Sequence, residues 1–508
     1  MTKIVLTTDH TLLSEFRNIP LGNFLSCVPV ERVPESVFNF IAPLVPANPD
    51  GSCKLAPYGL RKVEAALLKD FKREDVIVAH PNHVNKFIDK DTEIVGVYTM
   101  DALGLGPVSM MFSPGGLTPY TKYKFLQLVR SLKRGSDLKY KLVIGGQATW
   151  QLEYQPQYID ELKIDHLVTG QADLEIGRIF NEIISGTNQR NIKIYNTPSL
   201  DQVPTIVNPS MNGIVECMRG CGRGCHFCEP TMRKSVYVPF ENLRKEIEVN
   251  LKAGKHRVWM HTDDIFMYKF YDKDLDSNQE AILELLEFVM GIPGVTGCNP
   301  THGSISPAAA HPDLIEKMTK ILRGGPQNWL GIQQGLETGS PELMKKYMPL
   351  KVKPLDVEDW PQIVLDSLSV FNKNYWFPAY TLIVGLPQEQ EEDVWQTVDL
   401  LHRMEQLPNS HFSVATLSFT PIGVLRGKEA FNMDQMLDEA KFNLIYNTWK
   451  HEIKEFNNSM WMLMKNNVAI KTALYVIGKI GSGFVLKEIE KYGKYRGFKI
   501  RKPEAIPV

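Results

Sequence analysis

Three cysteines in a glycine-rich loop constrain this 508-residue chain more than any other feature of its sequence. Cys221, Cys225 and Cys228 are separated by three and then two residues, and Phe227 directly precedes the last of them. This spacing can place three thiolates on three irons of one cubane cluster and leave the fourth iron open. Residues 213–216 before the loop read as a short buried strand, so the loop leaves the carboxyl end of a strand. In parallel α/β barrels the active site lies at that end.

A zinc site is the ordinary alternative for clustered cysteines in an intracellular protein. Structural zinc normally needs four donors, usually in two pairs, and the sequence has no second CxxC pair and no HxxxH. Cys217 and His226 could complete a zinc site locally, so this alternative stays open. Cys217 is otherwise expected to be a buried thiol packed under the loop, not a ligand. Arg219 and Arg223 are expected to add positive charge that favours a reduced cluster; the alternative is that either is a surface residue.

Composition excludes several classes of partner. The net charge is -1 and no block of consecutive Lys or Arg occurs, so we expect neither nucleic acid nor an anionic membrane as a partner. The N-terminus runs directly into a strand-like segment without a leader, and no uninterrupted run of about 18 apolar residues occurs. The best candidate, Ala473 to Val485, is broken by Lys479. Cysteine usage fits a reducing cytoplasm, and the length suffices for two or three domains.

Residues 1–185 alternate short β-branched runs with amphipathic helical stretches. The expected strands are Lys3–Thr8, Asp75–His80, Glu93–Tyr98, Lys141–Ile144 and His166–Thr169, and the expected helices between them are Leu60–Phe71, Lys122–Lys133 and Leu174–Ile184. This alternation predicts a Rossmann-like α/β domain with a parallel sheet between two layers of helices. Such sheets bind ligands beyond the carboxyl ends of the strands, where the strand order reverses.

The ends of these strands carry the residues that we expect to bind a ligand. They are Tyr98, Thr99 and Asp101 after the third strand, Gly145, Gly146 and Gln147 after the fourth, and Gly170 and Gln171 after the fifth. Glycines at these points would let a flat, bulky ligand approach the backbone. The alternative is that each glycine serves only a turn.

The rest of the chain divides into three further parts. Residues 186–211 form a polar, proline-punctuated linker. Residues 212–427 repeat strand and helix, with further strands expected at Val258–His261, Gly294–Cys298, Leu330–Gly335, Tyr380–Val384 and Phe412–Leu417. Six strands predict a partial (β/α)6 barrel of the TIM type. Residues 428–508 are expected to form a mainly helical C-terminal domain, in which Met460–Met464 either cap the barrel or pack in its core.

The cysteine loop resembles the CxxxCxxC loop of the radical S-adenosylmethionine (SAM) superfamily. This resemblance implies a partial barrel that binds a [4Fe-4S] cluster and SAM. Asp263 and Asp264 lie where relatives carry the acidic motif that receives the amino group of SAM, although one of them could simply cap a helix. Glu337 lies in a segment that resembles the Gly-x-Glu motif near the ribose and methionine of SAM. It could instead be an acid in the first turn of a helix.

The first domain resembles the cobalamin-binding domain that precedes many radical SAM domains. The resemblance rests on the series Ala56–Leu60, Val95–Val97, Val143–Gly146 and Asp165–Gly170. The Asp-x-His-x-x-Gly motif that supplies a histidine to cobalt is absent, because Asp9-His10 has no such continuation. The resemblance therefore implies cobalamin without a histidine ligand. Tyr98 is a candidate for the position below cobalt, and its alternative role is that of a buried core tyrosine.

Together these resemblances imply a class B radical SAM methyltransferase. Such an enzyme removes hydrogen from an unactivated carbon with a 5'-deoxyadenosyl radical and transfers a methyl group from methylcobalamin. The layout is similar to archaeal enzymes that modify methyl-coenzyme M reductase, particularly glutamine C-methyltransferases. This implies a protein or peptide substrate, an external electron donor and the cytoplasm of an anaerobic methanogen.

Four alternatives to this function stay open. One is a small-molecule C-methyltransferase, and another is a cobalamin-dependent cyclase or oxidase, either of them in a natural-product or tetrapyrrole pathway. A methylthiotransferase would need a second three-cysteine cluster, which Cys27 and Cys53 cannot supply. The last is a metal-dependent scaffold or electron carrier, which would neither cleave SAM nor bind a corrinoid.

Overall fold

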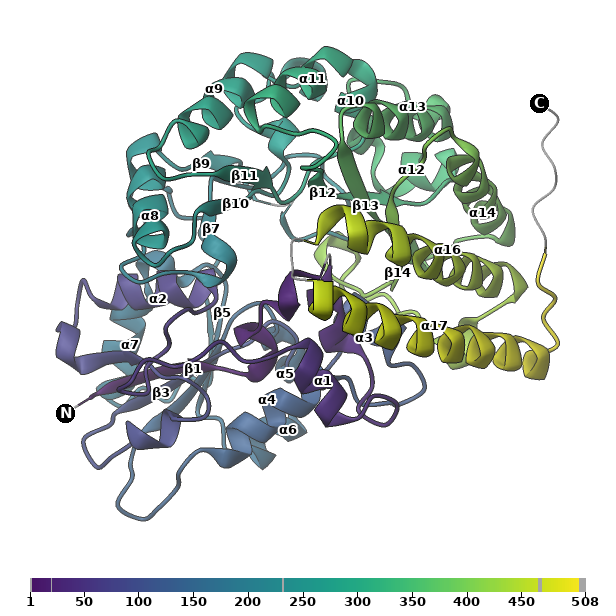
Figure 1. The fold of residues 1–508 in the computed structure, drawn as a ribbon. Coiled ribbons are helices and arrows are strands. Elements are labelled where there is room, and N and C mark those ends of the chain that lie inside the picture. Colours follow the sequence, from purple (N-terminus) through teal and green to yellow (C-terminus); the bar gives the residue numbers. More distant parts are fainter. Residues whose placement is uncertain (1, 20, 231–232, 465–467, 502–508) are drawn as a thin grey trace. The chain divides into compact units, whose positions relative to one another are not determined.

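The computed structural model describes residues 2–19, 21–230, 233–464 and 468–501 (Figure 1). The chain forms two compact units. The first contains residues 1–17, 21–215 and 238–258, and the second contains residues 18–20, 216–237 and 259–508. The chain therefore enters each unit more than once.

The first unit is built on a six-stranded parallel sheet in the order β2-β1-β3-β4-β5-β6. The strands are β1 Ile4–Thr8, β2 Val76–Val78, β3 Ile94–Tyr98, β4 Lys141–Gly145, β5 His166–Thr169 and β6 Asn191–Lys193. All five predicted strands are confirmed, whereas β6 lies inside the predicted linker. The strand order reverses between β1 and β3, so the carboxyl ends of these two strands border the crevice where such sheets bind ligands.

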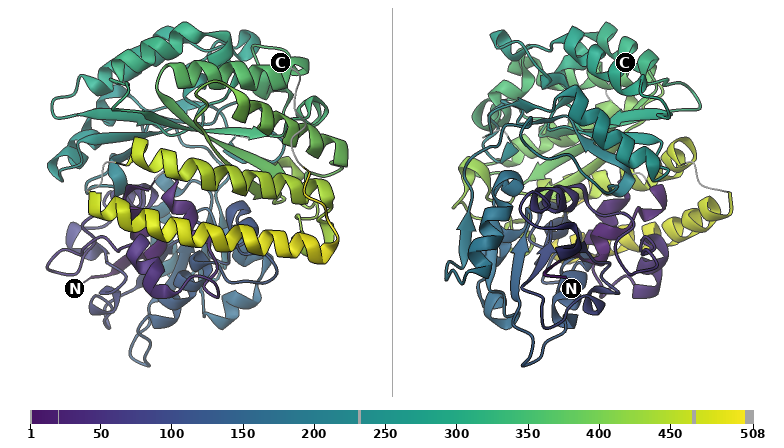
Figure 2. Two further views of the ribbon diagram at one scale, coloured as in Figure 1. Left: turned by 45° about the vertical axis from the view of Figure 1, so that its right-hand side comes forward. Right: turned by 90° about the vertical axis from the view of Figure 1, so that its left-hand side faces the viewer.

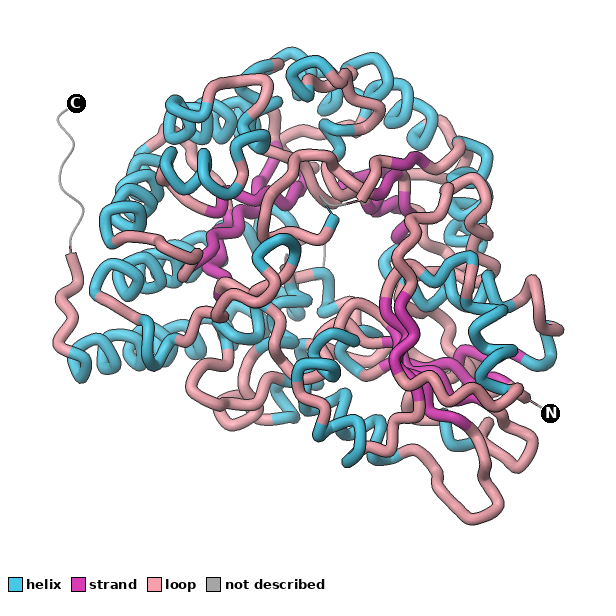
Figure 3. Tube along the Cα trace, turned by 180° about the vertical axis from the view of Figure 1, so that it is seen from behind, coloured by secondary structure: helices cyan, strands magenta, loops and turns pink. Residues whose placement is uncertain are grey.

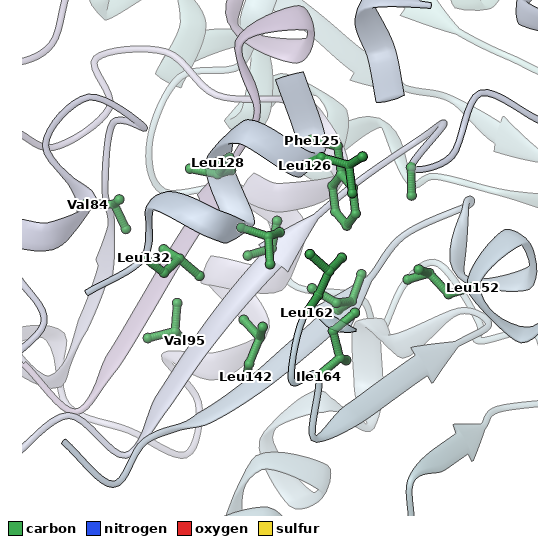
Figure 4. Packing of buried hydrophobic residues seen from close by; sticks show 14 of the residues in the cluster. Val84, Val95, Phe125, Leu126, Leu128, Leu132, Leu142, Leu152, Leu162 and Ile164 are labelled. Atoms are coloured by element: carbon green, nitrogen blue, oxygen red, sulfur yellow. The ribbon is translucent and has the colours of Figure 1, made fainter. Parts of the chain in front are cut away.

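Helices cover both faces of this sheet because its side chains alternate between the faces. Ile4 and Leu6 of β1 pack with α2 (Tyr58–Leu67) and α7 (Ile176–Ile184). Val5 belongs to the opposite layer, which contains α4, α5 and α6. Figure 4 shows that layer, with Leu128 of α4 among the buried strand residues. The remaining helices of this set are α1 Glu35–Ile41, α3 Pro107–Phe112, α4 Tyr120–Ser131, α5 Thr149–Tyr154 and α6 Gln157–Glu161.

The predicted linker is tied into the first unit by α8 (Phe240–Lys252). The carboxylate of Glu246 on α8 accepts hydrogen bonds from Lys62 Nζ at 2.6 Å and from the backbone N–H of Ile206 at 3.1 Å. Residues 186–211 thus run between α2 and α8 with buried contacts of their own. The predicted domain boundaries at 185, 211 and 427 stay predictions.

Beyond the six-stranded sheet the described chain has two three-stranded sheets, β11-β10-β7 and β12-β13-β14, of which β7 and β10 begin in residues of the first unit and β11 to β14 belong to the second. The strands are β7 Ile214–Glu216, β10 Arg257–His261, β11 Gly297–Pro300, β12 Leu330–Glu337, β13 Trp376–Val384 and β14 Ser413–Ser418. All six expected strands are present, and β12, β13 and β14 are parallel neighbours. A single parallel bridge between His302 and Gln333 joins the segment after β11 to β12.

Helices alternate with these strands along the chain (Figure 3). They are α9 Gln279–Met290, α10 Ser306–Ala310, α11 Pro312–Ile321, α12 Pro341–Tyr347, α13 Trp360–Lys373, α14 Glu391–Gln406 and α15 Met433–Met436. The second unit is therefore an α/β structure with parallel strands, as the sequence predicts.

Two long helices end the chain, α16 (Glu439–Leu463) and α17 (Val468–Arg496), and they lie side by side (Figure 2). The side chains of Met460 and Trp461 lie outside the described residues. Within the described residues, α17 is long and apolar enough to cross a membrane by length and composition. The best candidate in the sequence, Ala473–Val485, lies within this helix and was set aside because Lys479 interrupts the apolar run. One such helix is weak evidence for a membrane span.

Candidate cofactor sites

A short hairpin holds the cysteine loop. Strand β8 (Met218–Arg219) pairs antiparallel with β9 (Val236–Tyr237), so the ends of the loop meet. Glycines 220, 222 and 224 all have φ between 68° and 79°, a backbone conformation that other residues rarely adopt. Cys221 and Cys225 are buried, and Cys228 is half-buried. No pattern in the sequence marks the hairpin, because strands of two residues show no periodicity.

The three thiols are close enough to influence one another. Burial raises the pKa of Cys221 to about 12, and the charges of Asp264, Cys225 and Cys228 act in the same direction. Binding to iron would favour the deprotonated form instead, because a cysteine loses its thiol proton when it binds a metal. Among the described residues, no three His, Cys, Asp or Glu side chains are placed to hold one metal ion. The thiolates of a cubane each bind a different iron, so they need not converge on one ion.

Cys217 is a structural thiol. It is wholly buried, and its Sγ donates a hydrogen bond to the carbonyl of His261 at 3.4 Å. Burial raises the pKa of Cys217 well above the usual value. A neutral, hydrogen-bonded thiol here agrees with the expected packing role.

The two arginines of the loop are paired with carboxylates. Arg219 Nε lies 2.7 Å from Glu216 Oε1, and Arg223 Nε lies 2.8 Å from Asp264 Oδ2. Both arginines are buried, with exposed fractions of 9% and 2%. The alternative that either is a surface residue is therefore wrong. Each arginine has a carboxylate beside it that the sequence spacing did not reveal, and an effect of the two charges on the cluster stays a prediction.

The two predicted SAM-binding aspartates hold the loop itself. Asp264 caps the short helix η9 (Ile265–Met267), and its oxygens accept from Phe266 N, Ser304 N and Arg223. This is the capping role kept open above. Asp263 Oδ2 accepts from the backbone N–H of Gly220 at 2.6 Å. Contact of either carboxylate with SAM stays a prediction.

Removing Arg223 should destabilise the second unit strongly. Its guanidinium also donates to Ser304 Oγ at 2.8 Å and to the carbonyl of Leu350 at 3.1 Å. We expect Arg223→Leu to cost about 3–5 kcal/mol, because it leaves Asp264 buried and unpaired. The matched control is Arg426→Leu, since Arg426 forms an exposed ion pair with Glu229 and should cost less than about 1 kcal/mol. Thermal unfolding of the two variants checks this, and equal losses would contradict it.

Glu337 is the last residue of β12 and has a left-handed backbone with φ 65°. Its carboxylate is buried and pairs with Lys351 Nζ at 2.6 Å. The alternative that Glu337 is a first-turn helix acid is wrong, because Ser340 caps α12 and Glu342 is the acid of its first turn. Lys351 was missed by the sequence reasoning, since no motif marks it.

In the first unit, Tyr98 is the last residue of β3 and Thr99 follows it, at the carboxyl edge of the sheet. The Tyr98 ring packs against the α2 and α7 layer, and burial raises its pKa to about 12, so the phenol is neutral. The hydroxyl of Thr99 is wholly buried and has no hydrogen-bond partner among the described residues. Buried hydroxyls are normally partnered, so this one fits a site completed by a ligand or water.

Asp101 is occupied by protein donors. Its carboxylate accepts from Gly106 N, Ser109 Oγ, Thr121 Oγ1 and Gln151 Nε2 at 2.5–2.9 Å. These donors come from three different segments, so Asp101 organises the loop after β3. Its predicted contact with a cofactor stays untested.

The glycines at the strand ends differ in whether the packing of the protein itself requires a glycine. A Cβ on Gly146 would lie 2.3 Å from the carbonyl oxygen of Thr99, and one on Gly170 would lie 2.2 Å from that of Ile194. The backbone of the sheet itself thus requires these two glycines. A Cβ on Gly145 would meet nothing closer than 3.8 Å, so protein packing does not require that glycine. Of the two predicted glutamines, Gln147 is exposed and Gln171 is half-buried.

Asp9, directly after β1, supplies a pH-dependent contribution to stability. It is buried, and burial raises its pKa from 3.8 to about 6 against the hydrogen bonds from Thr11. The folded state therefore holds this proton more tightly than the unfolded state. The stabilisation is complete below about pH 4 and is lost as the pH rises to about 6, a loss of about 3 kcal/mol.

We expect Asp9→Asn to raise the free energy of unfolding at pH 8 by up to about 3 kcal/mol and to change it little at pH 4. The asparagine oxygen can still accept from Thr11 N. Thermal unfolding at the two pH values checks this. A variant that is equally stabilised at both would refute the assignment.

Comparisons with known proteins place the cysteine loop in a recognised family. Residues 215–401 match the model of the Radical SAM superfamily. The uncharacterized protein MJ1620 of Methanocaldococcus jannaschii is 26% identical over 269 residues, which cover 48% of this chain and 49% of that protein. The tRNA-2-methylthio-N(6)-dimethylallyladenosine synthase of Fusobacterium nucleatum is 22% identical over 307 residues, which cover 59% and 64%. The chain thus spans less than two thirds of the length of these relatives.

Two solved structures share the fold at low sequence identity. The radical SAM methyltransferase TsrM from Kitasatospora setae, with cobalamin and a [4Fe-4S] cluster bound, has a TM-score of 0.51 at 13% identity and covers 84% of this chain and 74% of its own. Apo OxsB, a cobalamin-dependent SAM radical enzyme, has a TM-score of 0.50 at 13% identity and covers 80% and 53%. The family match and the three-cysteine loop lead to the same conclusion: residues 215–401 are a radical SAM domain, which implies a [4Fe-4S] cluster and SAM.

Proposed function

We propose that this protein is a cobalamin-dependent radical SAM methyltransferase that methylates an unactivated carbon. The observation that carries the proposal is the combination, in one chain, of the three-cysteine loop with a parallel sheet whose strand order reverses between β1 and β3. The likeness of the fold to TsrM supports this combination. We propose that residues 212–427 form the partial (β/α)6 barrel of the TIM type.

Cys221, Cys225 and Cys228 would hold the cluster, and Asp263, Asp264 and Glu337 are the proposed contacts of SAM. Cluster and SAM together supply radical chemistry, and cobalamin supplies a transferable methyl group. The role of the chain is to exclude water and to fix the charges. The buried thiols lie away from water. The carboxylates that pair with the two arginines hold the arginine charges in place.

For cobalamin, the fit rests on the carboxyl edge of the first sheet. Thr99 has a buried hydroxyl without a partner among the described residues, a Cβ on Gly145 would meet no protein atom closer than 3.8 Å, and Tyr98 has a neutral phenol. We propose Tyr98 as the residue below cobalt.

For the acceptor, we propose a protein or peptide, with the glutamine Cα of methyl-coenzyme M reductase as the first candidate. An external one-electron donor and the cytoplasm of an anaerobic organism complete the proposal. The support is the resemblance of the layout. A small-molecule acceptor, or a cyclase or oxidase reaction, is the alternative.

A methylthiotransferase is the second candidate, because several relatives are tRNA-2-methylthio-N(6)-dimethylallyladenosine synthases. That reaction is expected to need a second three-cysteine cluster. Before the linker the chain has only Cys27 and Cys53. Both are buried, and burial raises the pKa of each to about 12. This chain therefore favours methyl transfer.

Anaerobic reconstitution tests the proposal. The full chain is loaded with iron, sulfide and hydroxocobalamin, and bound iron, bound corrinoid, 5'-deoxyadenosine and S-adenosylhomocysteine are then quantified with peptides of methyl-coenzyme M reductase present. We expect about four irons and about one corrinoid per chain, with both SAM products formed. About eight irons without corrinoid would favour methylthio transfer. SAM cleavage without corrinoid would overturn the cobalamin assignment.

A further inference from the structure

We infer that Lys351 is a positioning residue of the radical SAM domain, which fixes a positive charge beside Cys225 and Cys228 and orients the carboxylate of Glu337. The inference rests on the proposed cluster at the cysteine loop. It assigns a role to a residue that no sequence motif marks.

The ion pair of Lys351 and Glu337 is built into the domain. Both residues are buried, with exposed fractions of 8% and 7%. The pair lies over the Cα of Gly335, where a Cβ would come within 1.9 Å of Glu337 Oε1 and 2.4 Å of Lys351 Nζ. Gly335 is therefore required by the ion pair. The Gly-x-Glu segment and Lys351 form one structural unit.

The backbone of Lys351 is fixed against the cysteine loop. Arg223 donates to the carbonyls of Leu350, Lys351 and Lys353 at 3.1–3.3 Å. Ser306 Oγ donates to two of the same carbonyls, at 3.1 and 3.2 Å. Such a segment cannot move away from the loop without breaking these buried bonds, so the ammonium group is held in place.

The ammonium end of the pair lies against the cysteine loop. Lys351 Nζ lies 5.9 Å from the centre of the Phe227 ring. Phe227 stands between Cys225 and Cys228 in the sequence of the loop. The positive charge is therefore held next to the segment that carries two of the three thiols.

A fixed cation at this place should ease reduction. One electron from an external low-potential donor makes the cluster more negative by one charge, and a nearby buried cation stabilises that charge more than it would in water. Arg219, Arg223 and Lys351 are each paired with one carboxylate. Lys351 is our candidate for the favourable charge because its ammonium lies against the Phe227 ring of the cysteine loop.

The test is a redox titration of the reconstituted full chain, followed by electron paramagnetic resonance of the reduced cluster. We expect Lys351→Met to keep its iron and to show a more negative midpoint potential, and Lys351→Arg to restore the potential. Glu337→Gln should shift the potential the other way, since it removes the opposing charge. Lys345→Met is the control, because Lys345 pairs at the surface with Glu342 and Glu358, and it should leave the potential unchanged.

An unchanged potential in iron-loaded Lys351→Met would overturn the inference. If that variant fails to load iron, Glu337→Gln decides: a shift to less negative potential supports the inference, and no shift refutes it. Failure of the unmodified protein to take up iron would instead refute the proposed cluster. The two failures are thus distinguishable.

Discussion

Replacing Cys225 by alanine should abolish the cluster, with iron falling from about four per chain to below about one. In the proposed cluster each thiolate of the loop would hold a different iron, so the two remaining cysteines would leave a second iron open. Cys225 is also the most buried of the three cysteines, with an exposed fraction of 5%. Water cannot easily replace its sulfur. Formation of 5'-deoxyadenosine should be lost together with the iron.

Cys217→Ala is the matched control for this result. Cys217 lies four residues before Cys221, and its Sγ is engaged with the carbonyl of His261. We expect this variant to keep about four irons and to cleave SAM. Iron is measured colorimetrically and SAM products by chromatography. Equal iron loss in both variants would mean that Cys217 is a ligand and would reopen the zinc alternative.

Gly145→Leu should remove corrinoid binding, from about one per chain to near zero, while the first unit stays folded. The physical reason is that a side chain at Gly145 meets no protein atom closer than 3.8 Å from its Cβ. It would project into space that we assign to cobalamin. Corrinoid is measured by absorbance after removal of the excess, and folding by circular dichroism.

Gly146→Ala makes the complementary comparison. Its φ of 110° and the 2.3 Å approach of its Cβ to the carbonyl of Thr99 mean that even a methyl group strains the backbone. We expect at least about 1 kcal/mol of destabilisation. If Gly145→Leu also unfolded the protein, or bound corrinoid normally, Gly145 would not border the cofactor.

Much of the fold could be predicted, because its strands alternate with long amphipathic helices. Strands such as β3 and β10 were found within a few residues. The failures were short elements: β6, β8 and β9 have only two or three residues, too few for a period to appear.

The candidate site could be predicted only where it is local in sequence. The spacing of Cys221, Cys225 and Cys228 is visible in eight consecutive residues. Arg223 pairs with Asp264, which lies 41 residues away in the sequence. Asp101 accepts from Gln151, which lies 50 residues away. Sequence spacing carries no information on such contacts. The charged residues could therefore be identified from the sequence, but the partners that neutralise them could not.

The placement of α8 has a consequence for the order in which the chain folds during synthesis. Lys62 emerges from the ribosome 184 residues before Glu246, the carboxylate that neutralises it. Tyr58, whose hydroxyl donates to Glu246 in the folded chain, is also synthesised before this partner. The cysteine loop is translated in between, so the first unit is still incomplete when the loop appears. A fragment that ends at residue 211 would expose a surface made for α8, and we expect it to aggregate.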